Sequence, residues 1–173
     1  MKIKIIQFLL LSSLIFLGMS CSNSDTTQST SKTNVTVDNE AQLQAQDTIK
    51  ITLNSNDRMQ FDLSEIVVWA GQIVHLTLKH TGTLPLESRG HNFVLIDNAI
   101  SVNDFAKKTV NEKENQYLPK DKSNVIAHTD LIGGGQSTEV FFAVPAVGTY
   151  DYLCSFPGHA SIMKGKLIVK AKN

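Results

Sequence analysis

Residues 154–163 read Cys154-Ser155-Phe156-Pro157-Gly158-His159-Ala160-Ser161-Ile162-Met163. This loop follows a strand-like segment, residues 149–155, and carries a thiol, an imidazole and a thioether. Far upstream, Gly90-His91-Asn92 opens another strand-like segment and adds a second imidazole. Two imidazoles and one thiolate, with a weakly bound thioether, form the ligand set of a blue copper site. The two stretches therefore predict a copper site where their loops meet.

This mixture of ligands suits a metal that alternates between two oxidation states. Thiolate and thioether sulfur stabilise Cu(I), imidazole binds both states, and a long axial contact leaves the geometry between the preferences of the two. Taken singly, Met163 or His91 has a commoner explanation as a packed side chain, and Cys154 as an inert buried thiol. The joint spacing favours the ligand interpretation.

The rest of the chain carries the period-two alternation of apolar and polar residues that is typical of strands. Ile49, Ile51 and Leu53 begin the pattern, and Gly, Pro, Asn and Asp residues separate the later segments. The further expected strands are residues 59–63, 66–69, 73–80, 91–97, 138–144, 149–155 and 166–170. Only residues 102–114 have helical character. Many short strands with one insertion predict an all-β sandwich or barrel.

Residues 1–20 are predicted to be a lipoprotein signal peptide. Lys2 and Lys4 precede an apolar run at residues 5–17, which is shorter than the about 20 residues of a membrane-spanning helix. Residues 17–21, Leu-Gly-Met-Ser-Cys, are similar to the lipoprotein box, in which the cysteine is acylated and becomes the first mature residue. We therefore predict lipidation of Cys21. The alternative is an ordinary cleavage site followed by a cysteine by chance.

Residues 21–46 are rich in Ser, Thr, Asn and Gln and poor in large apolar side chains. Such a segment cannot bury enough apolar surface to order itself, and it predicts a flexible tether. A flexible chain of about 25 residues has a root-mean-square reach of roughly 25–30 Å. We expect one folded domain over residues 47–173, held near a membrane in the periplasm or cell envelope.

Charge and cysteine content narrow the class of protein further. The chain has 16 Lys and Arg against 16 Asp and Glu. No block of like charge is visible, which argues against a nucleic-acid partner. If Cys21 carries lipid, Cys154 is left without a disulfide partner. A single thiol in an oxidising compartment needs an occupant, and a metal is the simplest one.

From residue 47 to residue 170 the chain resembles the azurins, bacterial copper proteins of the cupredoxin family. The shared motifs are Asn56-Asp57-Arg58-Met59-Gln60-Phe61, Leu84-Pro85, Gly90-His91-Asn92, Val125-Ile126-Ala127-His128-Thr129, Leu131-Ile132-Gly133 and residues 154–165. The resemblance implies an eight-stranded Greek-key β-sandwich with a short helical flap over residues 100–115. It also implies one type 1 copper ion.

The resemblance further implies a role for each residue of the site. His91, Cys154 and His159 would be the equatorial ligands, with Met163 and the main-chain carbonyl of Gly90 on the axis. Two more residues, Asn92 and Phe156, would stiffen the ligand loops and tune the sulfur by hydrogen bonding.

In azurins, redox partners dock on an apolar face around the second histidine ligand, here His159. The matching positions are Met59, Leu84, Phe156, Pro157, Gly158, Ala160 and Ile162. Arg89 and Ser88 replace apolar residues that are common in the family, so we expect salt-dependent docking and an acidic partner. By family analogy the partners are c-type cytochromes or a copper nitrite reductase.

The remaining histidines are expected to have structural or no roles. His80 shares a face with apolar residues and should be packed inside, whereas His75 and His128 should be exposed. Phe93 stands where the family usually has a core tryptophan, and the usual family disulfide is missing.

The expected function is one-electron transfer between redox partners in the cell envelope. The alternative is a copper carrier or storage protein, which would use the same ligands in an open, exchangeable site. An enzyme with Cys154 as nucleophile and His159 as base lacks an orienting carboxylate at a suitable spacing, and four ligands leave no open position on the metal. We therefore expect no enzymatic activity, no small-molecule substrate, and membrane contact through the lipid anchor only.

Overall fold

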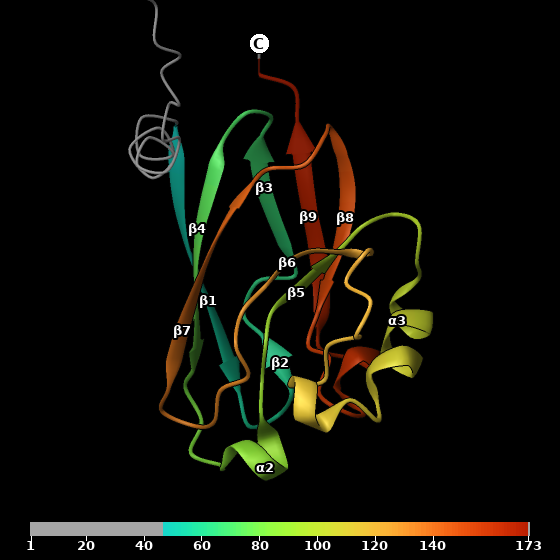
Figure 1. The fold of residues 1–173 in the computed structure, drawn as a ribbon. Coiled ribbons are helices and arrows are strands. Elements are labelled where there is room, and N and C mark those ends of the chain that lie inside the picture. Colours follow the sequence, from blue (N-terminus) through green and yellow to red (C-terminus); the bar gives the residue numbers. More distant parts are fainter. Residues whose placement is uncertain (1–46, 173) are drawn as a thin grey trace, which may run out of the picture. The chain divides into compact units, whose positions relative to one another are not determined.

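The computed structural model describes residues 47–172, which form two β-sheets packed face to face (Figure 1). The predicted signal peptide, Cys21 and the predicted tether lie outside the described residues. No helix within residues 47–172 is long and apolar enough to span a membrane.

The first sheet has four strands. In their order of pairing they are β2 (Gln60–Phe61), β1 (Thr48–Asn56), β4 (Ile73–His80) and β7 (Ser137–Ala143). β1 runs parallel to β4, and β4 runs antiparallel to β7. Along β4, Val74, Leu76 and Leu78 are buried while His75 and Thr77 between them are half-buried, as the sequence alternation predicted.

The second sheet has five strands. In order they are β3 (Glu65–Trp69), β9 (Lys164–Lys170), β8 (Gly148–Leu153), β5 (Val94–Ile96) and β6 (Val125–His128). β3 is parallel to β9, and the other pairs are antiparallel. The chain changes sheets from β2 to β3, from β3 to β4, from β4 to β5, from β6 to β7 and from β7 to β8, which gives the crossed connections of a Greek-key sandwich.

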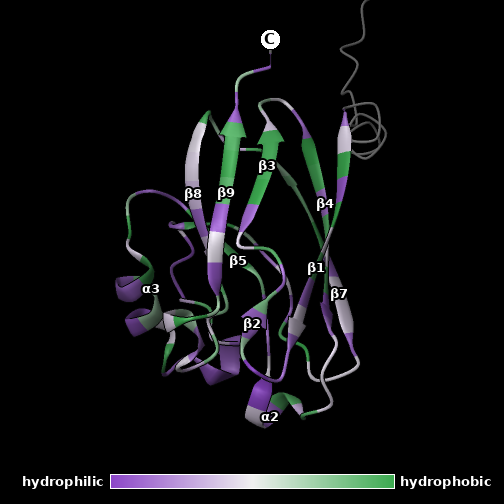
Figure 2. Cartoon of the chain, turned by 180° about the vertical axis from the view of Figure 1, so that it is seen from behind, coloured by the Kyte–Doolittle hydropathy of each residue, from purple (hydrophilic) through white to green (hydrophobic). Residues whose placement is uncertain are grey.

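Two apolar clusters fill the domain. The larger one lies between the sheets and includes the fully buried Leu53, Val68, Leu78 and Phe93. A smaller one lies under the flap and joins Phe105 of the flap, and Leu118 just after it, to residues of β5, β8 and the following loop. Figure 2 shows hydrophobic colours on β3 and part of β9 in the second sheet and on β4 in the first.

The flap is less regular than predicted. α3 (Val102–Thr109) begins at Ser101, whose Oγ accepts a hydrogen bond from the Asp104 N–H at 3.1 Å. The predicted continuation to residue 114 is wrong, because the chain turns after Thr109 and forms a separate 3₁₀ turn, η1 (Lys113–Asn115). This turn sends Leu118 into the smaller cluster.

Two short elements were not predicted, α2 (Leu86–Arg89) and β6. Four residues are too few to show a helical or strand period. The described residues therefore contain nine strands rather than the expected eight. The all-β sandwich class is confirmed.

Candidate metal centre

Strand pairing brings the two predicted ligand loops together. Val94 of β5 pairs with Leu153 of β8, so His91, just before β5, and Cys154, just after β8, emerge at the same end of the sheet. The second loop is closed by a 3.0 Å hydrogen bond from the Cys154 N–H to the Met163 carbonyl. This end lies beside α2 at the bottom of Figure 1.

The predicted ligands converge and are shielded from water. The Cys154 Sγ lies 3.5 Å from the His159 Nδ1 and 3.9 Å from the Gly90 carbonyl oxygen. The rings of His91 and His159 meet edge to face with centroids 5.2 Å apart. Cys154, His91 and Met163 are 0% exposed and His159 is 1% exposed.

The ring nitrogens of His91 indicate that a ligand binds between the two loops. Its Nδ1 and Nε2 are both buried, and neither has a hydrogen-bond partner among the described residues. Buried polar side-chain atoms nearly always have a partner, so two orphaned nitrogens on one ring require an explanation. Metal coordination accounts for one of them directly.

Burial determines the protonation states of the His91, His159 and Cys154 side chains. It lowers the pKa of His91 to about 3, with smaller contributions from His80 and His159. It lowers the pKa of His159 to about 4, helped by the nearby charge of Arg89. Burial raises the pKa of the Cys154 thiol to about 12 against hydrogen bonds from main-chain N–H groups. The imidazoles are thus neutral, as a ligand must be, and the thiolate needs a cation to form.

No three His, Cys, Asp or Glu side chains within residues 47–172 are close enough to enclose an ion as they stand. The fit of a metal therefore rests on the unpartnered nitrogens of His91 and on the buried sulfur atoms. Cu(I) and Cu(II) accept this combination of imidazole, thiolate and thioether donors.

A buried pair of hydrogen-bonded side chains joins the two loops. The Ser155 N–H donates to Asn92 Oδ1 at 2.9 Å, and Asn92 Nδ2 donates to Ser155 Oγ at 2.8 Å. The sequence indicated Asn92 but not Ser155. Gln116 was also missed: its carbonyl accepts a 3.4 Å bond from Asn92 Nδ2, and its Oε1 accepts the Leu131 N–H at 2.7 Å.

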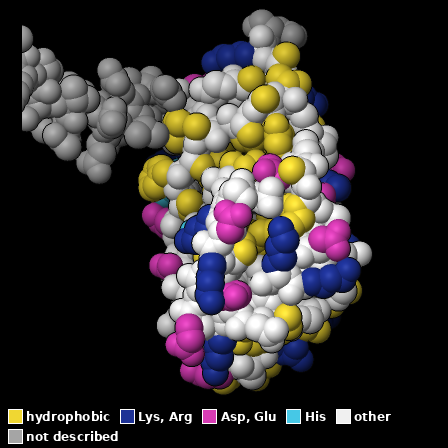
Figure 3. Space-filling model, turned by 45° about the vertical axis from the view of Figure 1, so that its right-hand side comes forward, with side chains coloured by type: hydrophobic (Ala, Val, Ile, Leu, Met, Phe, Trp, Pro, Cys, Tyr) yellow, Lys and Arg dark blue, Asp and Glu magenta, His cyan; other side chains and the backbone are white. Residues whose placement is uncertain are grey.

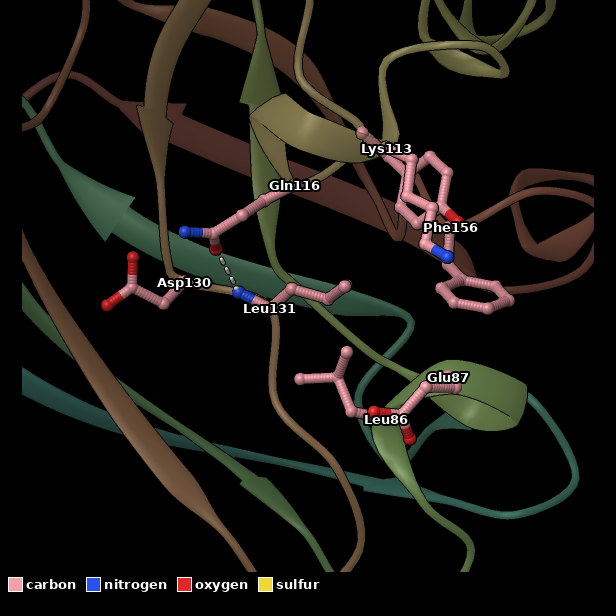
Figure 4. Close-up of a pocket in the computed structure, with 8 residues that line it drawn as sticks. Leu86, Glu87, Lys113, Gln116, Asp130, Leu131 and Phe156 are labelled. Atoms are coloured by element: carbon pink, nitrogen blue, oxygen red, sulfur yellow. Dashed lines mark hydrogen bonds between the residues drawn. The ribbon is translucent and has the colours of Figure 1, made fainter.

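Phe156 covers the site from outside. Its ring lies 4.6 Å from that of His159 between centroids, and Tyr117 packs edge-on against it at 5.1 Å. On the outer side of Phe156 is a pocket of about 550 Å³. Figure 4 shows the Gln116–Leu131 hydrogen bond in its wall, with Leu86 of α2 facing it. Gln116 therefore lines the pocket and also accepts a hydrogen bond from Asn92, which supports the loop of His91.

Gly90 and His80 hold His91 from the other side. A Cβ on Gly90 would lie 2.7 Å from the Leu86 carbonyl, so only glycine lets α2 pack against the ligand loop. His80 is stacked on His91 with ring centroids 4.1 Å apart. The His80 Nδ1 accepts the Gly82 N–H at 3.0 Å, so its Nε2–H donates to the Arg89 carbonyl, also at 3.0 Å. The predicted packing of His80 is confirmed.

The predicted docking residues surround the His159 loop with unequal exposure. Leu84 is 39% and Ile162 58% exposed, Gly158 is exposed, and Met59 and Pro157 are half-buried. Ala160 is 6% exposed because it packs into the cluster under the flap, so its assignment to the docking surface is wrong. Arg89 is half-buried, with its Nη1 3.0 Å from the Met59 sulfur.

The two histidines expected on the surface are half-buried. His75 Nε2 pairs with Glu139 at 2.9 Å, and its ring stacks on Phe141 at 4.0 Å. His128 contacts the Lys122 ammonium at 3.2 Å. His75 is covered by neighbours on the adjacent strand β7, which the sequence could not show, whereas the neighbour of His128 lies in the loop before β6.

Fold and site together define a copper protein of the cupredoxin type. The family model for copper-binding proteins of the plastocyanin/azurin family matches residues 47–170, so the chain belongs to this family. Copper is the cofactor of the site.

Curated relatives and solved structures agree with this assignment. The chain is 42% identical to "Outer membrane protein H.8" of Neisseria gonorrhoeae over 119 residues, 67% of this chain and 64% of that protein; it therefore spans under two thirds of that relative. It is 41% identical to "Azurin-1" of Alcaligenes xylosoxydans xylosoxydans over 124 residues, 68% of this chain and 94% of the relative. The structure of auracyanin A, a "blue" copper protein from Chloroflexus aurantiacus, matches with TM-score 0.65 and 34% identity, covering 71% of this chain and 99% of that one.

Proposed function

We propose that this chain is a one-electron carrier of the cell envelope, with copper held by His91, Cys154 and His159 and more weakly by Met163 and the Gly90 carbonyl. The observation that supports this most strongly is that both nitrogens of His91 are buried with no partner among the described residues, beside the buried Cys154 thiol. When bound, copper supplies a Cu(II)/Cu(I) couple.

The protein's own contribution is a rigid and dry set of ligands. Asn92 and Ser155 tie the two loops together, and the main-chain bond from Cys154 to Met163 closes the second loop. Loops fixed in this way limit the rearrangement that accompanies electron transfer. Burial of every proposed ligand side chain excludes water and competing ligands.

The same features favour an electron carrier over an enzyme. Within residues 47–172 no carboxylate hydrogen-bonds to His159 to orient it as a base for the Cys154 thiol. The proposed donors fill the coordination positions that a substrate would need. The alternative copper carrier is weakened by the same burial, because an exchangeable site has to be open.

The first experiment adds Cu(II) to the metal-free protein and records the visible spectrum. We expect an intense blue absorption, its loss in Cys154→Ser, and its retention in the matched control Ser161→Ala, which changes an exposed residue of the same loop. A colourless wild-type protein would refute the copper site. Rapid loss of Cu(I) to a competing chelator, with no efficient electron exchange, would instead indicate a copper carrier.

We also propose that electrons enter and leave through His159, beneath a docking surface formed by Leu84, Pro157, Gly158 and Ile162. Arg89 lies close enough to this histidine to affect its pKa. A partner with acidic groups at its rim, such as a c-type cytochrome or a copper nitrite reductase, fits this charge. The association rate should fall with added salt, and Arg89→Met should flatten that dependence. The control Lys50→Met changes an exposed lysine on β1 and should leave it unchanged.

We propose the same domain organisation as the sequence predicts: residues 1–20 are removed, Cys21 carries lipid, and residues 21–46 tether the domain 47–173. The similarity to an outer membrane protein supports an envelope location. Incorporation of a labelled fatty acid into the wild-type chain, and its absence in Cys21→Ala, tests the anchor.

A further inference from the structure

An apolar surface lies at the opposite end of the sandwich from the copper site. Along β3, Val67 and Trp69 point outward and are 37% and 41% exposed, while Ile66 and Val68 between them are buried. Ile168, half-buried on β9, is the cross-strand partner of Val67. In Figure 2, β3 and the end of β9 carry hydrophobic colours on this side of the molecule.

A third strand extends this surface. Gly148 of β8 pairs with Val169, and extending this register by one residue places Val147, in the turn before β8, opposite Lys170, the cross-strand partner of Trp69. Val147 is 59% exposed. We call Val67, Trp69, Val147, Ile168 and Lys170 the tether-end surface. On the face drawn in Figure 3, apolar side chains likewise gather in the upper half, and most acidic and basic side chains lie in the lower half.

The chain enters the domain at this same end, and hydrogen bonds hold the entry point in place. The Asp47 carboxylate accepts a 3.1 Å bond from Gln72 Nε2 and lies 3.4 Å from the Lys172 ammonium. Gln72 Oε1 in turn accepts a hydrogen bond from the main-chain N–H of Trp69 at 2.9 Å. Asp47, at the start of the described chain, is therefore connected by hydrogen bonds to the turn that carries Trp69.

The chemistry of the tether-end surface fits a lipid headgroup region. Tryptophan beside lysine is typical of membrane interfaces, where the ring sits at headgroup depth and the ammonium meets anionic lipid. Within residues 47–172 no acidic side chain forms an ion pair with Lys170. We propose that the tether-end surface docks on an anionic membrane; this inference rests on the lipid anchor of the proposed function.

A surface with low intrinsic affinity for the membrane is sufficient for such docking. The tether keeps the domain within its own reach of the bilayer, which corresponds to an effective concentration on the order of millimolar. Without the anchor, two exposed valines, one tryptophan and one lysine would not hold a protein on a membrane.

Docking at this end determines how the copper site is oriented relative to the membrane. β9 begins directly after Met163 and ends at Lys170, and seven residues of strand span about 23 Å. The docked domain therefore presents the His159 loop away from the membrane, where a partner can reach it. The docked orientation thus serves electron transfer.

Trp69 is the single tryptophan of the chain, so its fluorescence reports on this surface alone. The acylated, copper-loaded protein is placed in phosphatidylethanolamine–phosphatidylglycerol vesicles and collected by flotation. We expect lipids brominated on the acyl chains to quench Trp69, and acrylamide quenching to fall several-fold relative to phosphatidylcholine vesicles. High salt should reverse part of the effect.

Two variants keep the reporter and remove the docking. Val147→Asp and Lys170→Glu change exposed side chains, so folding is preserved, and both should restore acrylamide quenching. Lys164→Glu makes the same charge change on the same strand at the copper end and should not.

Each other outcome contradicts the inference in a distinguishable way. Protein that floats while Trp69 stays open to acrylamide overturns the docking and leaves electron transfer intact. Protein that fails to float refutes the anchor, and the docking with it. Protection that grows with protein density and is insensitive to brominated lipid would mean that a second copy covers the surface.

Discussion

The two ends of the sandwich each bury one side chain, His91 and Gln72, whose polar atoms have opposite surroundings. At the copper end, both nitrogens of His91 are buried and have no hydrogen-bond partner within residues 47–172. At the tether end, Gln72 is 8% exposed and its side chain bonds to the Trp69 N–H and the Asp47 carboxylate. Leaving a buried polar group unsatisfied costs stability, whereas a satisfied one contributes to it. His91 is therefore placed for a ligand and Gln72 for holding the chain at its entry point, whereas Asn92 and Ser155 at the copper end are buried and hydrogen-bonded to each other.

The largest expected effect is that of copper itself. At free copper about a thousand times above the dissociation constant, binding stabilises the native state by about 4 kcal/mol. Urea unfolding with and without copper measures this difference. Hydrogen exchange should slow at residues 90–93 and 154–163 and stay unchanged at the turn 69–73. Equal slowing at both ends would contradict the division between them.

Acid should destabilise the metal-free protein through the copper end. His91 and His159 have native pKa values of about 3 and about 4, whereas in the unfolded chain both titrate near 6.5. Between these values the unfolded state binds more protons, so stability is complete above about pH 6.5 and falls as the pH drops toward 4. At about 1.4 kcal/mol per pKa unit, each histidine accounts for a loss of a few kcal/mol, and the two together for roughly twice that. Urea midpoints across this range measure it.

The acid effect has an internal control. Because carboxylates also titrate in this range, the comparison is with His91→Leu, which should have a shallower pH slope. Identical slopes in the two proteins would mean that His91 titrates normally and is not held neutral by burial.

Replacing His91 by an apolar residue should stabilise the metal-free protein. His91→Leu removes two unpartnered buried nitrogens, each of which costs about 1–3 kcal/mol, so we expect a gain of that order. The urea midpoint of the metal-free variant measures the gain, and its visible spectrum should lack the blue band. A loss of stability would show that His91 has a structural role beyond the ligand site.

The matching change at the tether end should have the opposite sign. Gln72→Leu leaves the Trp69 N–H without its acceptor and should cost about 1–1.5 kcal/mol in free energy of unfolding, with no change in the copper spectrum. The control Gln60→Leu, at an exposed position on β2, should stay within about 0.5 kcal/mol of wild type. If Gln72→Leu proves neutral, the hydrogen-bonded entry point contributes nothing to stability.

The sequence predicted long, alternating elements well and short ones poorly. β4 and β9 follow their apolar periodicity, because every second residue faces the core. α2 and β6 have four residues each and leave no periodic signal. The convergence of His91, Cys154 and His159 could be predicted because their residue types and spacing are specific, and their role as copper ligands stays a prediction. Ser155 and Gln116 were missed, since a serine or a glutamine is informative only once its partner across the fold is known.

The sequence by itself determined which residues are candidate donors and the strand periodicity, because both depend on residue type and on spacing within each segment. Only the tertiary structure decided that Val94 pairs with Leu153 and so brings His91 to Cys154. It also decided that Ala160 is buried under the flap and that Trp69, Val147 and Lys170 share one surface at the end where the chain enters. These are contacts between residues distant in sequence, and their free energy arises only when the sheets pair and pack.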